Sequence, residues 1–484
     1  MKPEDKALRL AEKRKRKKDS ALSSKDITPF HLFYHQGSPF VINIERMCAK
    51  AIDSPTAKIL ESLSAQPEVL LSAGAEKKLK EVGIISEGWE KKQRPVRTEP
   101  YPIINMCLFL TQSCNLNCVY CYGNGGEYGT GGSLEEKTAY QAVDWLIEQS
   151  REMKKIHLGF FGGEPLLKFP LMKEIVAYTN KRVQETGKEV RFHCTTNATL
   201  LDDEQIAFIR DHNISVMISI DGPREIQNAQ RPFTNGQGSY DIIVPKIKKL
   251  LDFLPDTPGH AVIVGNTDPQ VVKDEMKEIG FQKISVITSS QNLFCGEADK
   301  QKAERDTSNL LDILEQEAET WISLTRSRDA RALMELKNKS FLYFGLITLF
   351  HNKKLYYACS AGLGMVAVSV TGDVYLCQRF VGMADYKIGS VFESELNRGQ
   401  YEESPARSNP VCTACLARYY CAGGCKHDNV GSRGSLTTPS EEICRLRRRE
   451  LELAATIIGR LDPDDLAFLL GGDILPPKPC PLDF

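Results

Sequence analysis

The chain has 484 residues, of which 42% are hydrophobic and 26% are charged, and its formal net charge is −1. This balance is typical of a globular protein with roughly two to four domains. A net charge near zero argues against bulk nucleic-acid binding, so we expect no nucleic-acid partner. The basic start is not followed by an apolar stretch and no segment approaches the length of a membrane span, so we expect a cytoplasmic protein without a membrane partner.

The first part of the chain predicts a basic tail and a small separate unit. Residues 1–29 contain the run KRKRKK, which a solvated tail explains best; a contact with an acidic peptide or RNA is the alternative. Within residues 30–95, FHLFYH and FVINIERM flank a turn and predict a β-hairpin, while SPTAKILESL and AEKKLKEVGII predict helices. A hairpin followed by such helices indicates a winged-helix-like module. The stretch EGWEKKQRPVRTEP then predicts a linker.

Residues 101–300 alternate apolar strands with helical periods, which predicts a parallel β/α arrangement and an α/β fold class. The short polar or Gly-rich motifs QSCNLNCVYC, GGEP, TNAT and DGP each follow a strand, where β/α barrels carry their reactive groups. The six strand candidates are INMCLFLT, IHLGFF, VRFHCTT, ISVMISI, HAVIVG and KISVIT.

The second half of the chain divides into a helical bridge over 301–354, a cysteine-rich region over 355–450 and a C-terminal tail over 451–484. Fifteen cysteines in a cytoplasmic chain are expected to remain reduced. Five are scattered and are expected to be small buried apolar residues: Cys48, Cys107, Cys194, Cys295 and Cys480. Ten have ligand-like spacing: Cys114, Cys118 and Cys121, then Cys359, Cys377, Cys412, Cys415, Cys421, Cys425 and Cys444.

The first group, CNLNCVYC, has the spacing C-x3-C-x2-C. Four thiolates normally hold a four-iron cluster, and a three-thiolate loop leaves one iron open for a small molecule. A structural zinc knuckle is the alternative, and it needs a fourth Cys or His nearby. The sequence has neither between Tyr122 and Ile156, so the cluster is favoured.

CNLNCVYCY resembles the signature loop of the radical S-adenosylmethionine (SAM) enzymes, in which the open iron chelates SAM and its reduction yields a 5′-deoxyadenosyl radical. The resemblance implies that Cys114, Cys118 and Cys121 are both cluster ligands and catalytic residues. It also implies cofactor contacts from Tyr122 beside the adenine. The other implied contacts come from Gly162, Gly163 and Glu164 at the methionine amino group, Asn197 in TTNAT, Ser219 near the ribose, and Arg231 at the methionine carboxylate.

One segment departs from the family pattern. The usual His-Asp pair is replaced by Gln227–Asn228 within SIDGPREIQNAQR, so no role is carried onto these two residues.

The spacing of the seven later cysteines resembles the SPASM extension of radical SAM enzymes, which holds two auxiliary four-iron clusters. The resemblance implies one complete ligand set, formed by Cys412, Cys415, Cys421 and Cys444. It implies a second set of only three ligands, Cys359, Cys377 and Cys425, which leaves another open iron unless Cys295 folds back. Two zinc ribbons are the alternative.

These resemblances imply a partial (β/α)6 TIM-like radical SAM barrel with an N-terminal winged-helix-like peptide-recognition domain and a C-terminal SPASM domain. The implied cofactors are three [4Fe-4S] clusters and SAM. The implied partners are a ribosomally made peptide or small protein, bound through the N-terminal module, and an electron donor such as ferredoxin or flavodoxin. A DNA-binding winged helix is the alternative for that module, and its mixed charge does not favour it.

The open auxiliary iron favours a peptide maturase that forms thioether cross-links, similar to ranthipeptide-type and quinohemoprotein amine dehydrogenase maturases. A substrate cysteine would bind that iron as thiolate, and a carbon radical on a neighbouring residue would attack its sulfur.

Two alternatives remain open. An anaerobic sulfatase maturase carries an Asp, its base, directly after the cysteine matching Cys377, whereas Gln378 and Arg379 follow here. A non-catalytic iron–sulfur carrier or scaffold would not need GGEP or the SIDGP segment.

Overall fold

The computed structural model describes residues 27–65, 71–85, 100–264, 267–288, 297–337 and 340–470. The predicted basic run and linker, together with Cys295 and Cys480, lie outside these ranges. Within them, no helix combines the length and the apolar character that a membrane crossing requires.

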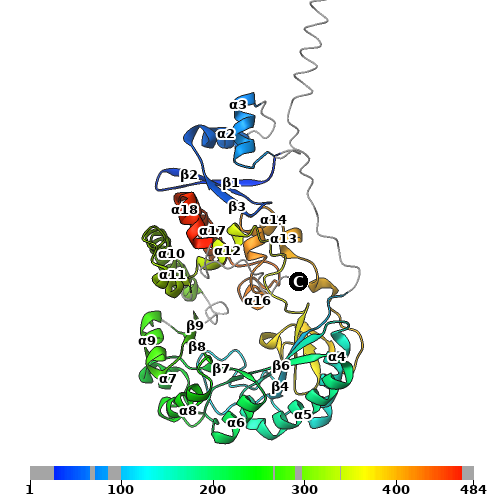
Figure 1. Ribbon diagram of the computed structural model, residues 1–484. Helices are drawn as coiled ribbons and strands as arrows, with labels where there is room; N and C mark the ends of the chain where they lie inside the picture. The colour runs from blue at the N-terminus through cyan, green and yellow to red at the C-terminus, as the bar shows by residue number, and fades with distance from the viewer. Residues whose placement is uncertain are drawn as a thin grey trace, which may run out of the picture.

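The centre of the molecule is an arc of six parallel strands with helices on its outer side (Figure 1), which confirms the predicted α/β partial barrel. All six predicted strands are present, in the spatial order of the sequence: β4 (Asn105–Thr111), β5 (Lys155–Gly162), β6 (Glu189–Thr196), β7 (Ser215–Ser219), β8 (Pro258–Ile263) and β9 (Lys283–Thr288). The helices are α4 (Glu136–Gln149), α5 (Phe169–Thr186), α6 (Asp203–Asp211), α7 (Arg224–Gln230), α8 (Tyr240–Phe253) and α9 (Pro269–Ile279).

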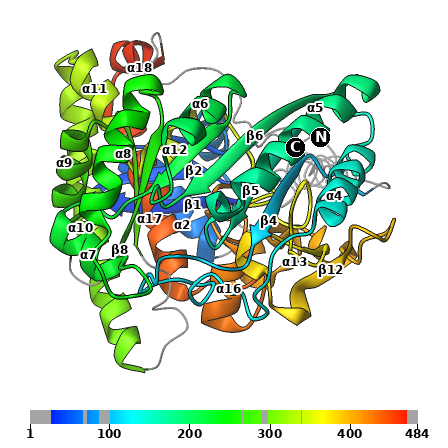
Figure 2. The ribbon, with the colours of Figure 1, turned by 90° about the horizontal axis from the view of Figure 1, so that it is seen from below.

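Buried and half-buried side chains alternate along strand β5, which distinguishes the two faces of this arc. In β5, Ile156, Leu158 and Phe160 are buried in the core. The intervening side chains His157 and Phe161 are only half-buried, so they lie on the opposite, concave face. Figure 2 shows α4 and α5 beside β4, β5 and β6. The concave face and the strand ends are therefore free to carry a site.

The sheet continues beyond the barrel into the cysteine-rich region. Strand β10 (Met365–Val368) pairs in parallel with β4, and β11 (Asp373–Tyr375) and β12 (Lys387–Ser390) follow as antiparallel strands. This continuation brings Cys377, two residues after β11, next to the barrel. The short helices of this region are α13 (Pro405–Ser408), α14 (Pro410–Thr413), α15 (Arg418–Cys421) and α16 (Lys426–Arg433).

The N-terminal unit is a three-stranded antiparallel sheet with two helices. The predicted hairpin is β1 (Phe30–His35) and β2 (Ser38–Asn43), and the predicted helices are α2 (Ser54–Ala65) and α3 (Ala73–Glu81). The sequence analysis missed β3 (Cys48–Ala51), the third strand. Val41 of β2 packs under α2 and α3, whereas Phe40 and Ile42 face the rest of the protein.

Five helices of the described chain, of which two are long, join this unit to the barrel. They are α10 (Glu297–Arg326), α11 (Ala330–Lys337), α12 (Tyr343–Phe350), α17 (Glu441–Arg460) and α18 (Pro463–Leu470). The domain boundaries expected at 300/301 and 450/451 fall inside α10 and α17, so the chain has no break at either point. Helix α17 continues because the segment ELELAATII is enclosed by neighbouring elements. It packs against α10, α12 and β3 and buries Leu451, Leu453, Ala454, Ala455 and Ile457.

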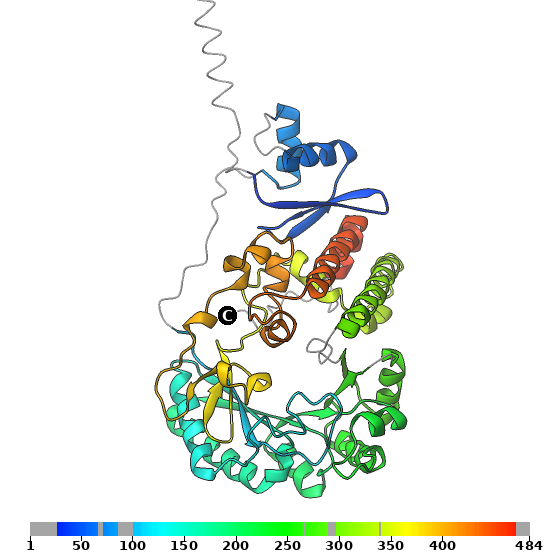
Figure 3. The same ribbon diagram turned by 180° about the vertical axis from the view of Figure 1, so that it is seen from behind.

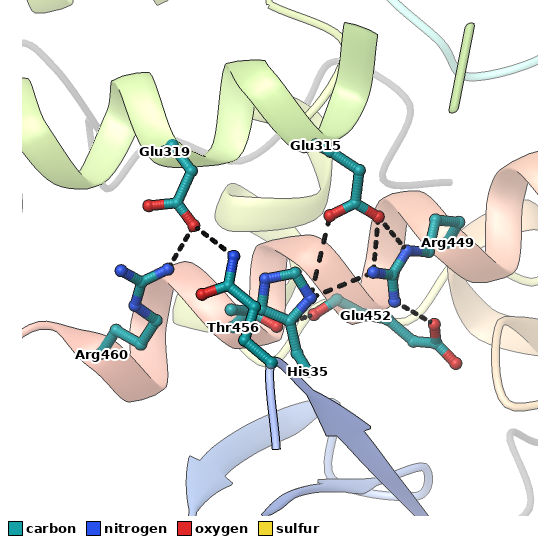
Figure 4. A network of polar contacts seen from close by, with 8 residues as sticks. His35, Glu315, Glu319, Arg449, Glu452, Thr456 and Arg460 are labelled. Atoms are coloured by element: carbon teal, nitrogen blue, oxygen red, sulfur yellow. Dashed lines mark hydrogen bonds and ion pairs between the residues drawn. The ribbon is translucent and has the colours of Figure 1, made fainter. Parts of the chain in front are cut away.

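The N-terminal sheet sits on α17 on the side away from the barrel (Figures 1 and 3). A Cβ on Gly459 of α17 would lie 2.8 Å from the Phe40 ring, so this glycine permits the close packing. Polar contacts also join the sheet to the helices. His31 Nε2 lies 2.9 Å from Glu452 Oε1. Arg449 lies 3.1 Å from His35 Nδ1 and 2.5 Å from Glu315, as Figure 4 shows. The unit is therefore attached by both apolar and charged contacts.

Candidate functional site

The loop that carries Cys114, Cys118 and Cys121 leaves the C-terminal end of β4, as predicted for a barrel site. All three cysteines are half-buried and free of disulfides. The loop is held by the segment after α7: Asn117 N donates to Pro232 O (2.8 Å) and Val119 N to Gln230 O (2.9 Å). The three thiols are thus presented from a fixed backbone.

The two glycines of the GGE motif let the end of β5 approach this loop. Gly163 N donates to Thr111 O (3.0 Å), and Glu164 N donates to Ser113 O (3.1 Å). A Cβ on Gly162 would lie 2.1 Å from Thr111 O, and one on Gly163 would lie 2.1 Å from Ser113 O. No real Cβ tolerates such a distance, so the loop position depends on both glycines.

Glu164 is buried, with 1% of its surface exposed, at the centre of this arrangement. Its carboxylate accepts hydrogen bonds from Leu166 N (3.0 Å), Thr196 Oγ1 (2.8 Å) and Asn197 N (2.8 Å). Burial raises the pKa of Glu164, and these hydrogen bonds oppose the rise. The carboxylate therefore connects the end of β5 to the TNAT turn after β6.

Asn197 of that turn connects back to the cysteine loop. Its Nδ2 donates to Asn115 Oδ1 (2.9 Å) and lies 3.8 Å from Cys114 Sγ, while Asn115 Nδ2 donates to Thr199 Oγ1 (2.8 Å). The structure thus brings Cys114, Glu164 and Asn197 together. Asn115 was missed by the sequence analysis, although it lies within CNLNC.

Arg231 lies on the other side of the loop, almost fully buried. Its NH1 donates to Tyr120 Oη (2.6 Å), which donates to Asp221 Oδ2 (2.6 Å). Within the part of the chain that the structure describes, the buried Nε of Arg231 has no acceptor. A buried guanidinium donor without a partner is costly, so it suits an anionic ligand group such as a carboxylate.

Tyr120 and Asp221 are further residues that the sequence analysis missed. Burial raises the pKa of Asp221, and the nearby Arg231 charge and the Tyr120 hydrogen bond oppose the rise. Asp221 Oδ1 also accepts from Val262 N of β8 (3.0 Å). The signal that could have revealed them is their position inside the two motifs, CVYC and SIDGP.

Gln227 and Asn228, to which no role was assigned, stabilise the turn that leads to Arg231. Gln227 Oε1 accepts from Asp221 N (2.8 Å) and its Nε2 donates to Ser239 Oγ (2.8 Å). Asn228 Oδ1 accepts from Tyr240 N at the start of α8 (2.9 Å). Ser219 ends β7, half-buried, and is paired in register with His260 of β8.

Tyr122 points from the cysteine loop toward the second cysteine group. Its ring centre lies 5.9 Å from that of Tyr128 and 6.3 Å from that of His427, and the Arg379 guanidinium lies 5.8 Å from it. The ring is 43% exposed. Tyr122 therefore occupies the space between the two cysteine groups.

The seven later cysteines separate into two sets by their electrostatic neighbours. The Cys412 thiol interacts with those of Cys415, Cys421 and Cys444. The Cys377 thiol interacts with those of Cys359 and Cys425. Burial raises the pKa of Cys377 and of Cys412 to about 12, so iron binding here would have to displace thiol protons. These neighbours belong to the two ligand sets that the resemblance implies. Among the described residues, however, no three Cys, His, Asp or Glu side chains are grouped closely enough to hold a single metal ion, so both ligand sets stay predictions.

One further thiol lies near the three-cysteine set. Cys107 of β4, which we expected to be an ordinary buried residue, interacts electrostatically with Cys377. Burial, the larger cause, and this neighbour raise the pKa of Cys107. Register explains the proximity, because Cys107 pairs with Ala367 of β10, and Ala367 pairs with Tyr375, two residues before Cys377.

Comparison with known proteins gives a family match for the barrel region. The family described as "Radical SAM superfamily" matches residues 108–288. An uncharacterized protein of Methanocaldococcus jannaschii is 38% identical over 135 residues, which cover 28% of this chain and 44% of that protein. The cysteine-type anaerobic sulfatase-maturating enzyme of Clostridium novyi is 23% identical over 335 residues, 66% of this chain and 86% of that enzyme.

A similar fold is present in the solved structure "Native anSMEcpe with bound AdoMet and Kp18Cys peptide". It superposes with a TM-score of 0.58 at 19% identity, covering 73% of this chain and 98% of that one. At this identity the likeness concerns the fold, and it extends well beyond the barrel.

Proposed function

Because residues 108–288 of this chain form a radical SAM domain, we propose that the protein is a SAM-dependent peptide maturase that forms thioether cross-links. The bound cofactors would supply a 5′-deoxyadenosyl radical and one-electron transfer. The chain itself would hold SAM, position a peptide cysteine and exclude water.

Among the residues that the structure describes, the buried Nε of Arg231 has no acceptor, and this observation supports the SAM site best. Arg231 lies beside Cys118, and Glu164 lies beside Cys114. The two side chains thus lie on either side of the loop with opposite charges, and an α-amino acid group has a carboxylate and an ammonium to pair with them. The residues therefore fit the cofactor, with the thiols of Cys114, Cys118 and Cys121 as cluster ligands.

The three-thiol set supports the thioether reaction. We propose that Cys359, Cys377 and Cys425 hold an auxiliary [4Fe-4S] cluster and that a substrate cysteine completes its coordination. The complete set, Cys412, Cys415, Cys421 and Cys444, would hold the other auxiliary cluster. Tyr122 lies between the SAM loop and the three-thiol set, so a peptide held there would be within reach of both.

The N-terminal unit is proposed to bind the peptide. Its small sheet offers edge strands, on which an extended peptide can add a further strand. Through α17 the unit is joined to the same region that carries Cys444. A peptide bound by the unit would therefore stay near the cysteine-rich region.

Formylglycine formation is the second candidate, because sulfatase-maturating enzymes of Clostridium novyi and Clostridium perfringens match about two thirds of this chain. Against it, the position after Cys377 is Gln378, which cannot serve as a carboxylate base. The next side chain, Arg379, pairs with Asp428 at 2.7 Å. Asp428 is thus a carboxylate near this set, and it is already engaged by a cation.

The decisive experiment combines reconstituted protein, SAM, dithionite and cysteine-containing peptides, ideally one encoded beside this protein. Thioether formation removes two hydrogens and retains the sulfur, whereas oxidation of cysteine to formylglycine removes the sulfur. Mass spectrometry distinguishes the two. Absence of 5′-deoxyadenosine from every mixture would leave only the non-catalytic carrier or scaffold.

A further inference from the structure

A buried lysine lies against the three-thiol set formed by Cys359, Cys377 and Cys425. Lys426, the first residue of α16, is 7% exposed, and its Nζ donates to Ala361 O (2.7 Å). Burial lowers the pKa of Lys426, and the thiols of all three cysteines in the set oppose this decrease. Among the described residues, no carboxylate forms an ion pair with Lys426. Burying an ammonium without a counter-charge is costly, so we infer that the three-thiol set supplies the negative charge that stabilises Lys426 in this position.

A second cation contacts the same set from the other direction. Arg379 NH1 lies 3.6 Å from Cys425 Sγ and 2.7 Å from Asp428 Oδ1. Its guanidinium also lies 5.8 Å from the Tyr122 ring. Two cations, Lys426 and Arg379, therefore face the set, and the Asp428 carboxylate balances one of them.

The charges at the first cysteine group have the opposite balance. There, Arg231 is the cation, and the Glu164 and Asp221 carboxylates are the charged neighbours of Cys114 and Cys118 respectively. Adding an electron to a cluster adds negative charge, which nearby cations and N–H···S contacts stabilise and nearby carboxylates oppose. The surroundings thus favour reduction at the three-thiol set over reduction at the first group.

We propose that Lys426 and Arg379 raise the reduction potential of a [4Fe-4S] cluster held by Cys359, Cys377 and Cys425, and thereby make it the acceptor of the substrate's electron. The inference rests on the proposed function and deepens it. When the cross-link forms, the substrate C–H hydrogen goes to the deoxyadenosyl group and the thiol proton goes to solvent. The C–S bond then forms, and the one remaining electron reduces this cluster from the 2+ to the 1+ state.

The test is a redox titration of the reconstituted protein followed by electron paramagnetic resonance. The background variant Cys114→Ala/Cys118→Ala/Cys121→Ala removes the signal of the first cluster, and the signal lost on adding Cys377→Ala is the one to follow. Lys426→Met should lower the equilibrium constant for reduction about tenfold or more, a shift of about 59 mV for one electron. Lys426→Arg should restore most of the wild-type midpoint.

Two further variants make the result specific. Asp428→Asn keeps Lys426 and Arg379 and removes the negative charge of the Asp428 carboxylate. The midpoint of the cluster should therefore shift to a more positive potential. This variant tests the proposal even if Lys426→Met fails to fold. Lys387→Met is the matched control, because Lys387 is an exposed lysine paired with Asp373 at 2.6 Å, and it should leave the midpoint unchanged.

The outcomes separate this inference from the proposed function. An assembled cluster whose midpoint is the same in Lys426→Met, Asp428→Asn and wild type would overturn the inference alone. Failure of the wild-type protein to assemble any four-iron cluster at these cysteines would overturn both.

Discussion

The backbone N–H of Asn197 donates a 2.8 Å hydrogen bond to the Glu164 carboxylate, which joins the turn after β6 to the motif after β5. The side-chain Nδ2 of Asn197 lies 3.8 Å from Cys114 Sγ. Two motifs separated by about thirty residues (roughly the length of a βα unit) thus support one corner of the cysteine loop. Glu164 therefore has a structural task in addition to its proposed contact with SAM.

Glu164→Gln should weaken SAM binding and modestly destabilise the fold. Loss of the negative charge removes the partner proposed for the SAM ammonium, which corresponds to about 10- to 100-fold in affinity. The NH2 group of the Gln amide cannot accept a hydrogen bond, so at least one N–H or O–H group that now donates to the carboxylate would lose its acceptor. Isothermal titration of anaerobic, cluster-loaded protein with SAM measures the first effect, and unchanged affinity would contradict the proposed contact.

Gly163→Ala should displace the cysteine loop. The new Cβ would lie 2.1 Å from Ser113 O, so either the loop or the end of β5 must move, at about 1–3 kcal/mol or more. We expect the first cluster to be lost, measured as iron per chain and as loss of its paramagnetic signal. Gly74→Ala is the matched control, because nothing lies within 4 Å of its Cβ position, and it should leave iron content unchanged.

Sequence patterns predicted the barrel well because each strand is a distinct apolar run ended by a motif. All six strands and the motif positions at their ends were predicted. Strand β3 was missed because CAKA has only four residues, none of them β-branched or aromatic. Strand β10 was missed because its pairing with β4 joins segments far apart in the sequence. Nonlocal pairing of this kind leaves no periodic signal.

Residues of the candidate site could be predicted where they belong to a recognisable sequence motif. Contacts between segments far apart in the sequence could not be predicted. The cysteines, Glu164 and Arg231 belong to recognisable motifs. Asp221 and Tyr120 also lie inside motifs, but their hydrogen bond joins positions 101 residues apart, and no spacing rule predicts that contact. The same is true of Lys426, whose relation to Cys359 and Cys377 depends on the packing of α16.

Tyr120→Phe should reduce SAM affinity without disturbing the iron content. The hydroxyl accepts from Arg231 and donates to Asp221, both at 2.6 Å, so its removal leaves two buried charged groups with one partner fewer. The expected cost is about 1–3 kcal/mol, divided between stability and SAM binding. Urea denaturation and SAM titration measure the two parts. Wild-type values for both would show that the hydroxyl does not position Arg231.

Cys377→Ala should stop cross-linking while SAM cleavage continues without coupling. Loss of one of the three thiol ligands proposed for the auxiliary cluster should remove that cluster, so bound iron should fall by about four per chain. Cys107→Ala is the informative comparison, because Cys107 lies near Cys377 but is not proposed as a ligand, and alanine has no atom that could bind iron in its place. Unchanged iron in Cys107→Ala supports the open coordination site. An equal loss of iron would identify Cys107 as the fourth ligand and contradict that part of the proposed function.

Glu45→Ala should loosen the attachment of the N-terminal unit to the rest of the protein. Glu45 is 6% exposed, lies 3.2 Å from Lys354 Nζ and from Tyr419 Oη, and also pairs with Arg418. Removing this carboxylate leaves two cations close together without their counter-charge, at about 3–5 kcal/mol. The apolar contact of Phe40 with α17 and the ion pairs of Figure 4 remain, so the unit should loosen without unfolding.

Hydrogen exchange at β1, β2 and α17 and limited proteolysis measure this loosening. Glu76→Ala is the matched control: Glu76 pairs with Lys80 at 2.9 Å on the exposed surface of α3, where such pairs contribute less than about 1 kcal/mol. If the unit binds the substrate peptide and presents it to the barrel, Glu45→Ala should lower cross-linking while uncoupled 5′-deoxyadenosine formation continues. Equal loss of both products would instead show that the docked unit maintains the barrel site itself.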